Sequence, residues 1–244
     1  WFESHFPCDF IVEYTGQIRC WFYYLHVLAV SLFDKPAFKN CVVHGTILAK
    51  DGKKLSKSSK NYTDPMELMK KYGTDAFRLY LFRSNAIVMN DLYFDENGIK
   101  SQVQQVLLPL YNCAKFFNSY AVLDNFEPDE NKIPKPTNEL DKWILAKLYD
   151  SEKQVEKCME DYQIDRYVEP IIDLLDGFSN WYIRRSRRRF WSTEKSKDKQ
   201  DAYETTFYVL VSLCKLLAPI TPVVSEKLYK HFTGNESVHL ANVP

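Results

Sequence analysis

One short cationic stretch, residues 50–60, has the residue types that most directly suggest chemistry. It holds Lys50, Lys53, Lys54, Lys57 and Lys60 against a single acid, Asp51. Two lysines three residues apart with hydroxyl side chains nearby suit a polyphosphate, because each ammonium group is a compact charge on a flexible stem. At ~4 Å and an effective dielectric near 20, one such contact gains roughly 4 kcal/mol before desolvation. The plainer alternative is a solvated surface loop, which is the usual fate of a lysine run.

The elements around this stretch predict where it lies. A turn signal, Asp51-Gly52, precedes it, and a helix-start signal, Asp64-Pro65, follows it, so we expect a loop between an extended segment and a helix. Upstream, residues 10–12 and 38–43 are typical of buried strands, and residues 18–32 have apolar side chains at helical spacing. Strand, helix and strand with short connections predict one parallel βαβ unit.

Ligands of parallel sheets bind beyond the carboxyl ends of the strands, so residues 13–17 and His44-Gly45 are expected to face one crevice beside the lysine loop. Within it, Gln17 and Trp21 are four residues apart and share a helix face. A carboxylate at Glu13 could hold an ammonium group, an amide could bond a hydroxyl, and an indole could line an apolar pocket. The alternative is a helix-start charge at Glu13 and a core residue at Trp21. For His44, a locally satisfied strand-end histidine is an equal alternative.

The remaining chain has helical patterns. Short helices are expected over residues 65–100, and longer ones over 103–117 (with Pro109 as a possible kink), 140–159, 164–191, 202–217 and 224–232, with a loop over 124–138. Four main helices with short connections predict an antiparallel bundle. The expected organisation is therefore α/β over residues 1–64, connecting helices over 65–100 and an all-α domain over 101–244.

A run of planar cations and aromatic rings, residues 180–191, is the candidate nucleic-acid surface. Its candidate contact residues are Trp181, Arg184, Arg185, Arg188, Arg189 and Trp191. Guanidinium forks match phosphates, and aromatic faces stack on unpaired bases. The alternative is a helix with a charged face and buried aromatic rings. Helical spacing puts Arg184 and Arg188 on one face, with Trp181 near them, and Arg185 and Arg189 on another.

Composition narrows the class of protein. The formal net charge is +0, so partner arguments rest on local patches. The six cysteines include no C-x-x-C pair, and no secretory or membrane-spanning run occurs, so we expect reduced thiols, no bound zinc or other metal, and an intracellular, cytoplasmic protein without a membrane partner. The first residue, Trp1, opens in the middle of a pattern, so we expect a piece of a longer polypeptide whose remainder is a partner.

Several motifs resemble one family. Lys54-Leu55-Ser56-Lys57-Ser58 resembles the lysine-methionine-serine-lysine-serine loop of class I aminoacyl-tRNA synthetases, with Leu for Met. Residues 9–22, DFIVEYTGQIRCWF, resemble the isoleucyl branch, apart from Gly16 in place of Asp and Cys20 in place of Gly. The arginine run, residues 140–145 and residues 217–222 resemble the anticodon-binding domain of that branch. The resemblance extends from Phe6 to Pro244.

This resemblance implies the second half of a Rossmann-like sheet, connecting helices and an anticodon-binding bundle from a ligase that joins isoleucine to its tRNA through an aminoacyl-adenylate. The implied substrates are ATP with Mg²⁺, isoleucine and tRNA. Lys57 would stabilise the pyrophosphate, with Lys54 assisting. Leu55, Ser56, Ser58, His44 and Gly45 would contact ATP. Glu13 and Gln17 would hold the adenylate, and Trp21 would contact the isoleucine side chain.

Other interpretations stay open. A valyl or leucyl synthetase shares the lysine loop, and an RNA-binding module without catalysis or another nucleotidyl transferase would retain parts of the pattern. The second signature of the family, a His-x-Gly-His turn, does not occur in the sequence, and neither does the editing insertion. We therefore expect that the chain alone does not aminoacylate tRNA.

Overall fold

The computed structural model describes residues 2–56, 61–130, 132–242 and 244. The chain divides into two compact units. The first consists of Trp1–Asp64 with Leu81–Asp95, and the second of Pro65–Tyr80 with Glu96–Pro244. Residues 65–100, expected to connect the two parts, are therefore shared between the units.

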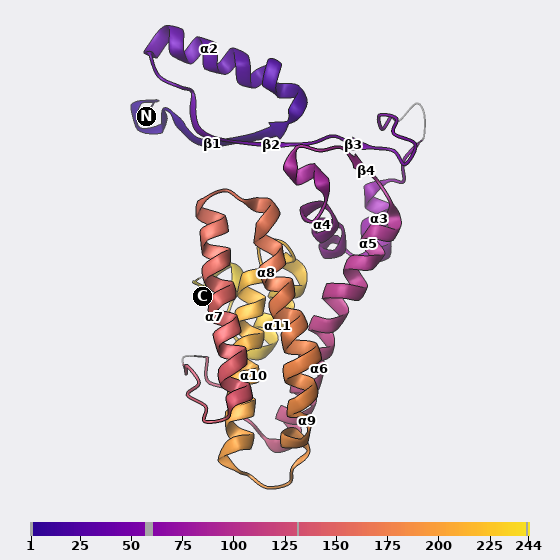
Figure 1. Ribbon diagram of the computed structural model, residues 1–244, viewed down its shortest axis with the longest axis vertical. Coiled ribbons are helices and arrows are strands. Elements are labelled where there is room, and N and C mark those ends of the chain that lie inside the picture. The colour runs from indigo at the N-terminus through magenta and orange to yellow at the C-terminus, as the bar shows by residue number, and fades with distance from the viewer. Residues whose placement is uncertain (1, 57–60, 131, 243) are drawn as a thin grey trace. The chain divides into compact units, whose positions relative to one another are not determined.

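The first unit is built on a parallel strand–helix–strand motif, as the sequence predicts. A short helix α1 (Phe2–His5) precedes β1 (Cys8–Tyr14), the 3₁₀ turn η1 (Thr15–Arg19), α2 (Trp21–Phe33) and β2 (Phe38–His44). The strands pair in parallel, and α2 connects them (Figure 1). Glu13 lies opposite Val43, and Tyr14 lies opposite His44. This register brings the carboxyl ends of both strands to one edge. The helix α2 ends where Asp34 adopts a left-handed conformation, two residues before Pro36.

A second, very short parallel sheet completes this unit. It pairs β3 (Ile47–Leu48) with β4 (Leu92–Tyr93), and the 3₁₀ turn η2 (Asn85–Val88) precedes β4. Leu48 also forms an isolated antiparallel bridge with Lys54. The strand β4 was not predicted, because two residues are too few for alternation to show in the sequence.

The second unit is helical among the residues that the structure describes. Its elements are α3 (Pro65–Tyr72), α4 (Thr74–Phe82), α5 (Glu96–Gln102), η3 (Val103–Leu107), α6 (Leu108–Asp124), α7 (Glu139–Glu160), α8 (Ile164–Asp176), η4 (Gly177–Ile183), α9 (Arg184–Trp191), α10 (Lys197–Leu217), α11 (Pro222–Thr233) and η5 (Val238–Leu240). The centre is α10, which contacts α6, α7, α8, α9 and α11. Within this 21-residue helix, 15 residues are buried, so it is surrounded by other helices.

Two π-helical segments interrupt the helices that the sequence predicts. The segment Val103–Leu107 leads directly into α6, with helical backbone at Leu107 and Leu108, so Pro109 follows a π turn within a continuous helical run. A π turn is one of the ways in which a helix accommodates the N–H group that a proline lacks. The segment Gly177–Ile183 joins α8 to α9 within the run predicted as one helix.

Two side chains attach α4 to the distant C-terminal helices. The guanidinium of Arg78 donates to the carbonyl oxygens of Pro219 and Ile220 at 2.8 and 2.9 Å. The buried carboxylate of Asp75 accepts from the N–H groups of Val223 and Val224 at 3.3 and 2.6 Å, which caps α11. These contacts explain why Pro65–Tyr80 belongs to the helical unit. Over the described part of the chain, no helix combines the length and the apolar character that a bilayer span requires.

Candidate functional site

Three predicted ligand contacts follow the carboxyl end of β1. Glu13 is half-buried, and its Oε2 accepts from the N–H of Tyr14 at 3.0 Å. Gln17 lies in η1, and its Oε1 accepts from the N–H of Trp21 at 3.1 Å, so this amide caps the start of α2. Trp21 is 46% exposed and packs beside Phe22 with ring centroids 5.5 Å apart. The Trp21 indole is therefore a surface of this unit rather than part of its core.

The end of β2 holds the predicted adenine-side residues. The Nδ1 atom of His44 lies 2.9 Å from the carbonyl oxygen of Gly45. Gly45 donates its N–H to Ala86 at 2.7 Å, and a Cβ atom here would come within 1.8 Å of the carbonyl oxygen of Asn90. The close backbone approach expected at this glycine is thus made by the segment before β4. Tyr14 and His44 are register partners, so Glu13 and His44 lie at one edge of the sheet.

The lysine loop is described only in part. Lys57 and Ser58, with Ser59 and Lys60, lie outside the described residues. One side chain, Asn61, joins what flanks them: its Oδ1 accepts from the N–H of Ser56 at 3.0 Å, and its Nδ2 donates to the carbonyl oxygen of Lys54 at 3.1 Å. The sequence analysis assigned no role to Asn61. Its residue type could have indicated one, because asparagine side chains often hydrogen-bond to backbone groups a few residues away.

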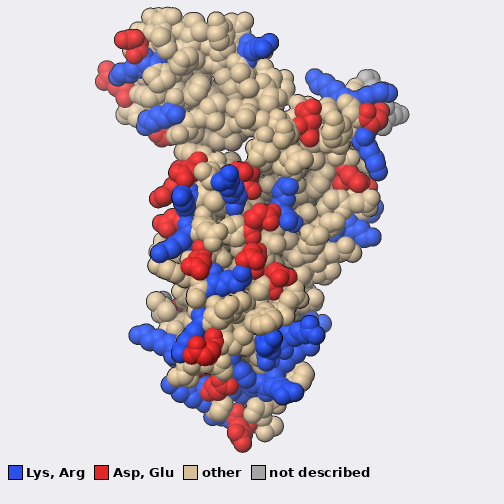
Figure 2. Space-filling model, viewed as in Figure 1, with Lys and Arg blue, Asp and Glu red and all other residues tan. Residues whose placement is uncertain are grey.

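The basic run of the second unit divides into exposed and buried members. Lys and Arg side chains gather at the end of the helical unit where α9 leads into α10 (Figure 2). Arg184, Arg185 and Arg188 are exposed, and Trp181 and Trp191 are 47% and 57% exposed. These side chains can meet a ligand without unfolding any element.

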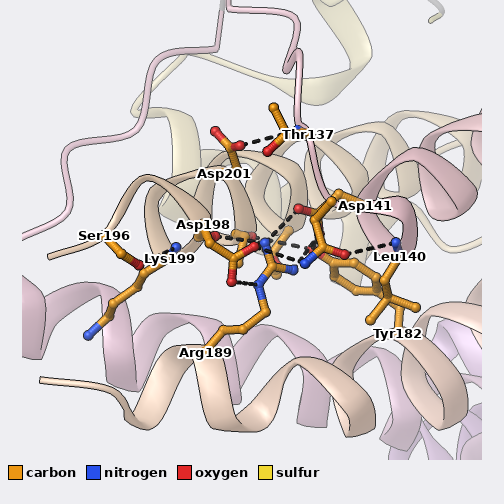
Figure 3. A network of polar contacts seen from close by, with 12 residues as sticks. Thr137, Leu140, Asp141, Tyr182, Arg189, Ser196, Asp198, Lys199 and Asp201 are labelled. Carbon is orange, nitrogen blue, oxygen red and sulfur yellow. Dashed lines mark hydrogen bonds and ion pairs between the residues drawn. The ribbon is translucent and has the colours of Figure 1, made fainter. Parts of the chain in front are cut away.

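Arg189 differs from its neighbours, because it is bound inside the unit (Figure 3). Its Nη1 and Nη2 donate to the two carboxylate oxygens of Asp141 at 2.6 Å each, and its Nε donates to Asp198 at 2.8 Å. Burial alone would lower the pKa of Arg189, but hydrogen bonds and charge from Asp141 outweigh it and raise that pKa. The geometry therefore argues against the tRNA contact predicted for Arg189 and gives it a structural part.

The aromatic contact of the run is made by Arg185. Its guanidinium carbon lies 3.5 Å from the centre of the Trp181 ring, and Asn180 and Arg184 line a hollow together with these two residues. Spacing alone had placed Trp181 with Arg184 and Arg188. Trp181 and Arg185 are four residues apart, which is also an ordinary spacing for neighbours on a helix face, so the sequence allowed this pair as well.

The described residues outside these two sites offer few groups with reactive chemistry. No group of three or more His, Cys, Asp or Glu side chains there could hold a metal ion. All six cysteines are free thiols, and burial raises the pKa of Cys113 to about 11 and of Cys214 to about 12. Thiols of this kind are poor nucleophiles and act as small apolar side chains.

Comparisons with known proteins identify the families that the two parts of the chain resemble. A family model described as tRNA synthetases class I (I, L, M and V) matches residues 1–95, and one described as the anticodon-binding domain of tRNA ligase matches residues 141–244. The isoleucine–tRNA ligase of Protochlamydia amoebophila (strain UWE25) is 46% identical over 246 residues, covering 100% of this chain and 24% of that protein. The isoleucine–tRNA ligase of Chlamydia trachomatis serovar L2 is 45% identical over 245 residues, covering 99% of this chain and 24% of that protein.

A solved structure has the same fold. It is the agnB2 LeuRS of Agrobacterium radiobacter K84, crystallised as a ternary complex with tRNA and LeuAMS. The match has a TM-score of 0.72 at 21% identity and covers 98% of this chain and 28% of that one. This chain thus spans about a quarter of the length of each of these three proteins.

Proposed function

We propose the function of this chain from its family, since the chain belongs to the class I tRNA synthetases. It is the part of an isoleucine–tRNA ligase that carries the lysine loop and the anticodon-binding helices. One observation carries this proposal: the similarity to isoleucine–tRNA ligases is 45–46% identity and extends over 99–100% of the chain. The whole protein joins isoleucine to ATP as an aminoacyl-adenylate and then transfers the acyl group to tRNA in the cytoplasm.

The activation step needs charge stabilisation and positioning, with no protein nucleophile. Lys57 stabilises the pyrophosphate leaving group, Lys54 assists, and Leu55, Ser56 and Ser58 shape the loop. Mg²⁺ accompanies ATP as part of the substrate. The bonds of Asn61 to Ser56 and Lys54 support this assignment, because they join the described residues on the two sides of the loop.

The amino-acid side of the reaction belongs to the first sheet edge. Glu13 and Gln17 hold the adenylate, Trp21 contacts the isoleucine side chain, and His44 with Gly45 lies beside adenine. The parallel register of β1 and β2 supports a shared site, since it aligns Tyr14 with His44 at the carboxyl ends of both strands. In this proposal residues 1–64 are the second half of a Rossmann-like domain.

The helical part receives the tRNA. Residues 65–100 connect the catalytic part to the bundle, and residues 101–244 form that antiparallel anticodon-binding bundle. Trp181, Arg184, Arg185, Arg188 and Trp191 remain proposed tRNA contacts, and their exposure supports this. Arg189 is not among them.

ATP binding tests the lysine loop. We expect Lys57→Ala to weaken ATP binding by the chain about tenfold or more, because a hydrogen bond to a charged group contributes roughly 1.5–3 kcal/mol. Isothermal titration with MgATP measures the change. The matched control is Lys35→Ala, an exposed lysine of the same unit outside the loop, which should leave the affinity unchanged. Equal affinities for both variants, or no ATP binding by the chain, would favour the RNA-binding module without catalysis.

A further inference from the structure

The tyrosine that ends β1 lies against a glycine two residues later. A Cβ atom at Gly16 would come within 2.5 Å of three atoms of the Tyr14 side chain, Cε2, Cζ and the hydroxyl oxygen Oη. The backbone at Gly16 does not adopt the left-handed conformation, so the missing side chain provides space here rather than conformational freedom. The hydroxyl end of the Tyr14 ring therefore occupies the place that a side chain at position 16 would take.

The local structure fixes the backbone from which this ring projects. Tyr14 is the register partner of His44 at the carboxyl end of the strand, and its N–H donates to Oε2 of Glu13 at 3.0 Å. The chain then enters η1, which carries both Gly16 and Gln17. The Tyr14 hydroxyl thus lies over the turn between Glu13 and Gln17, the two residues that we propose to hold the adenylate.

The Tyr14 hydroxyl is available to a ligand. Tyr14 is 39% exposed, and its hydroxyl makes no hydrogen bond within the part of the chain that the structure describes. A phenol is uncharged at neutral pH and can both donate and accept a hydrogen bond. The preceding residue, Glu13, carries a half-buried carboxylate, whose charge disfavours a phosphate at this point. The surroundings therefore favour a neutral hydroxyl group as the partner of Tyr14.

We propose that the Tyr14 hydroxyl binds a ribose hydroxyl of the nucleotide, and that Gly16 is needed because it leaves room for the Tyr14 ring. This inference rests on the proposed function and adds a residue to which that function gives no role. A site that hydrogen-bonds a hydroxyl of its substrate discriminates against the analogue without it, because a polar group of the site is then left unpaired. Tyr14 is thus a specificity-determining residue that favours ribonucleotides over nucleotides without sugar hydroxyls.

Nucleotide binding by the whole chain tests this inference. The probes are MgATP and its 2′,3′-dideoxy analogue, and isothermal titration gives the ratio of their affinities. We expect Tyr14→Phe, which keeps the ring, to reduce the preference for MgATP about five- to tenfold, the usual net effect of one hydrogen bond, and to leave binding of the analogue unchanged. Gly16→Ala should have the same effect, because its Cβ displaces the ring. The control is Tyr24→Phe, at an exposed tyrosine of α2, which should leave the ratio unchanged.

The outcomes separate this inference from the proposed function. If the wild-type chain binds MgATP and Y14F keeps the same preference, the hydroxyl does not bind the sugar, and the inference is overturned while the proposed function stands. If Y14F weakens binding of both nucleotides alike, Tyr14 does not distinguish the sugars and the inference is again overturned. If G16A keeps the preference, the role given to Gly16 is wrong. If the wild-type chain binds neither nucleotide, the proposed function fails and the inference fails with it. Circular dichroism melting of each variant checks that it is folded.

Discussion

At the scale of single residues, Arg185 and Arg189 show that arginines in the same run can have two different roles. They are four residues apart in one basic run, and both were predicted to contact tRNA. Arg189 meets the carboxylates of Asp141 and Asp198 and keeps 11% of its side-chain surface, whereas Arg185 lies on the ring of Trp181 and stays exposed. A buried cation needs paired acids, and a surface cation does not.

Glu152 gives a prediction at the same scale. Its Oε1 is buried and has no hydrogen-bond partner among the described residues. Burial raises the pKa of Glu152 to about 7 from 4.5, and the charge of Lys215 offsets part of the rise. Between these values the unfolded chain has lost the proton that the folded chain keeps, so stability falls as pH rises from about 4.5 to 7 and stays lower above that.

We therefore expect Glu152→Gln to stabilise the chain by about 1 kcal/mol at pH 8, a value discounted for partial exposure to solvent. The gain should vanish below pH 4.5, where the carboxyl is protonated in both states. Urea unfolding across this pH range measures it. Glu156→Gln, at an exposed position on the same helix, is the control and should show no such trend. A gain for E152Q that does not change with pH would contradict the prediction.

At the scale of elements, one guanidinium group, that of Arg189, joins three helices through two carboxylates. Asp141 lies on α7, Arg189 on α9 and Asp198 on α10 (Figure 3). The hydroxyl of Tyr182, from η4, also donates to Asp141 at 2.8 Å. Burial, together with the charge of Asp141, raises the pKa of Tyr182, so this hydroxyl stays neutral and remains a donor. The network fixes α9 against α7 and α10, and its other face then carries the exposed arginines.

The network should dominate the stability of this region. We expect Asp141→Asn to lower the free energy of unfolding by about 3–5 kcal/mol, because it removes the fully buried carboxylate that pairs with Arg189 and leaves only the partly exposed Asp198 to balance that charge. The control is Asp173→Asn, which removes the exposed partner of Lys147 and should cost at most about 1 kcal/mol. Urea titrations followed by circular dichroism at 222 nm measure both. Similar losses for the two variants would show that the buried pair contributes no more than a surface pair.

At the scale of the whole molecule, the two units have unlike cores. In the part of the chain that the structure describes, α2 buries Phe22 and Ala29, whereas α10 buries 15 residues. Large side chains of α2 stay exposed, including Tyr24 at 63% and Leu32 at 70%. Local stability increases with the number of buried apolar contacts. The sheet unit is therefore expected to have a lower local stability than the helical unit.

Hydrogen exchange should reveal this difference. We expect amides of α2 to exchange well before those of α10 in the same sample, because α2 opens without disrupting a large core. Mass spectrometry of peptides covering Trp21–Phe33 and Lys197–Leu217 gives the comparison. Protection of α2 equal to that of α10 would mean that the two units open together.

The sequence by itself determined the local elements and the family. Helical spacing predicted α2, α7, α8, α10 and α11, two β-rich runs around a helix predicted the parallel pairing of β1 and β2, and the lysine motif indicated class I synthetases. The helices and strands themselves depend on neighbours a few residues away, and periodicity reports such neighbours directly.

Only the tertiary structure decided which arginines are exposed to a ligand and to which of the two units residues 65–100 belong. Arg189 is removed from the surface by Asp141, 48 residues away, and Arg78 joins α4 to the carbonyl of Ile220 across 142 residues. The glycine at 45 likewise owes its role to Asn90. A local sequence pattern does not identify such partners, because the role of a charged side chain or of a glycine depends on the residues that the fold places beside it.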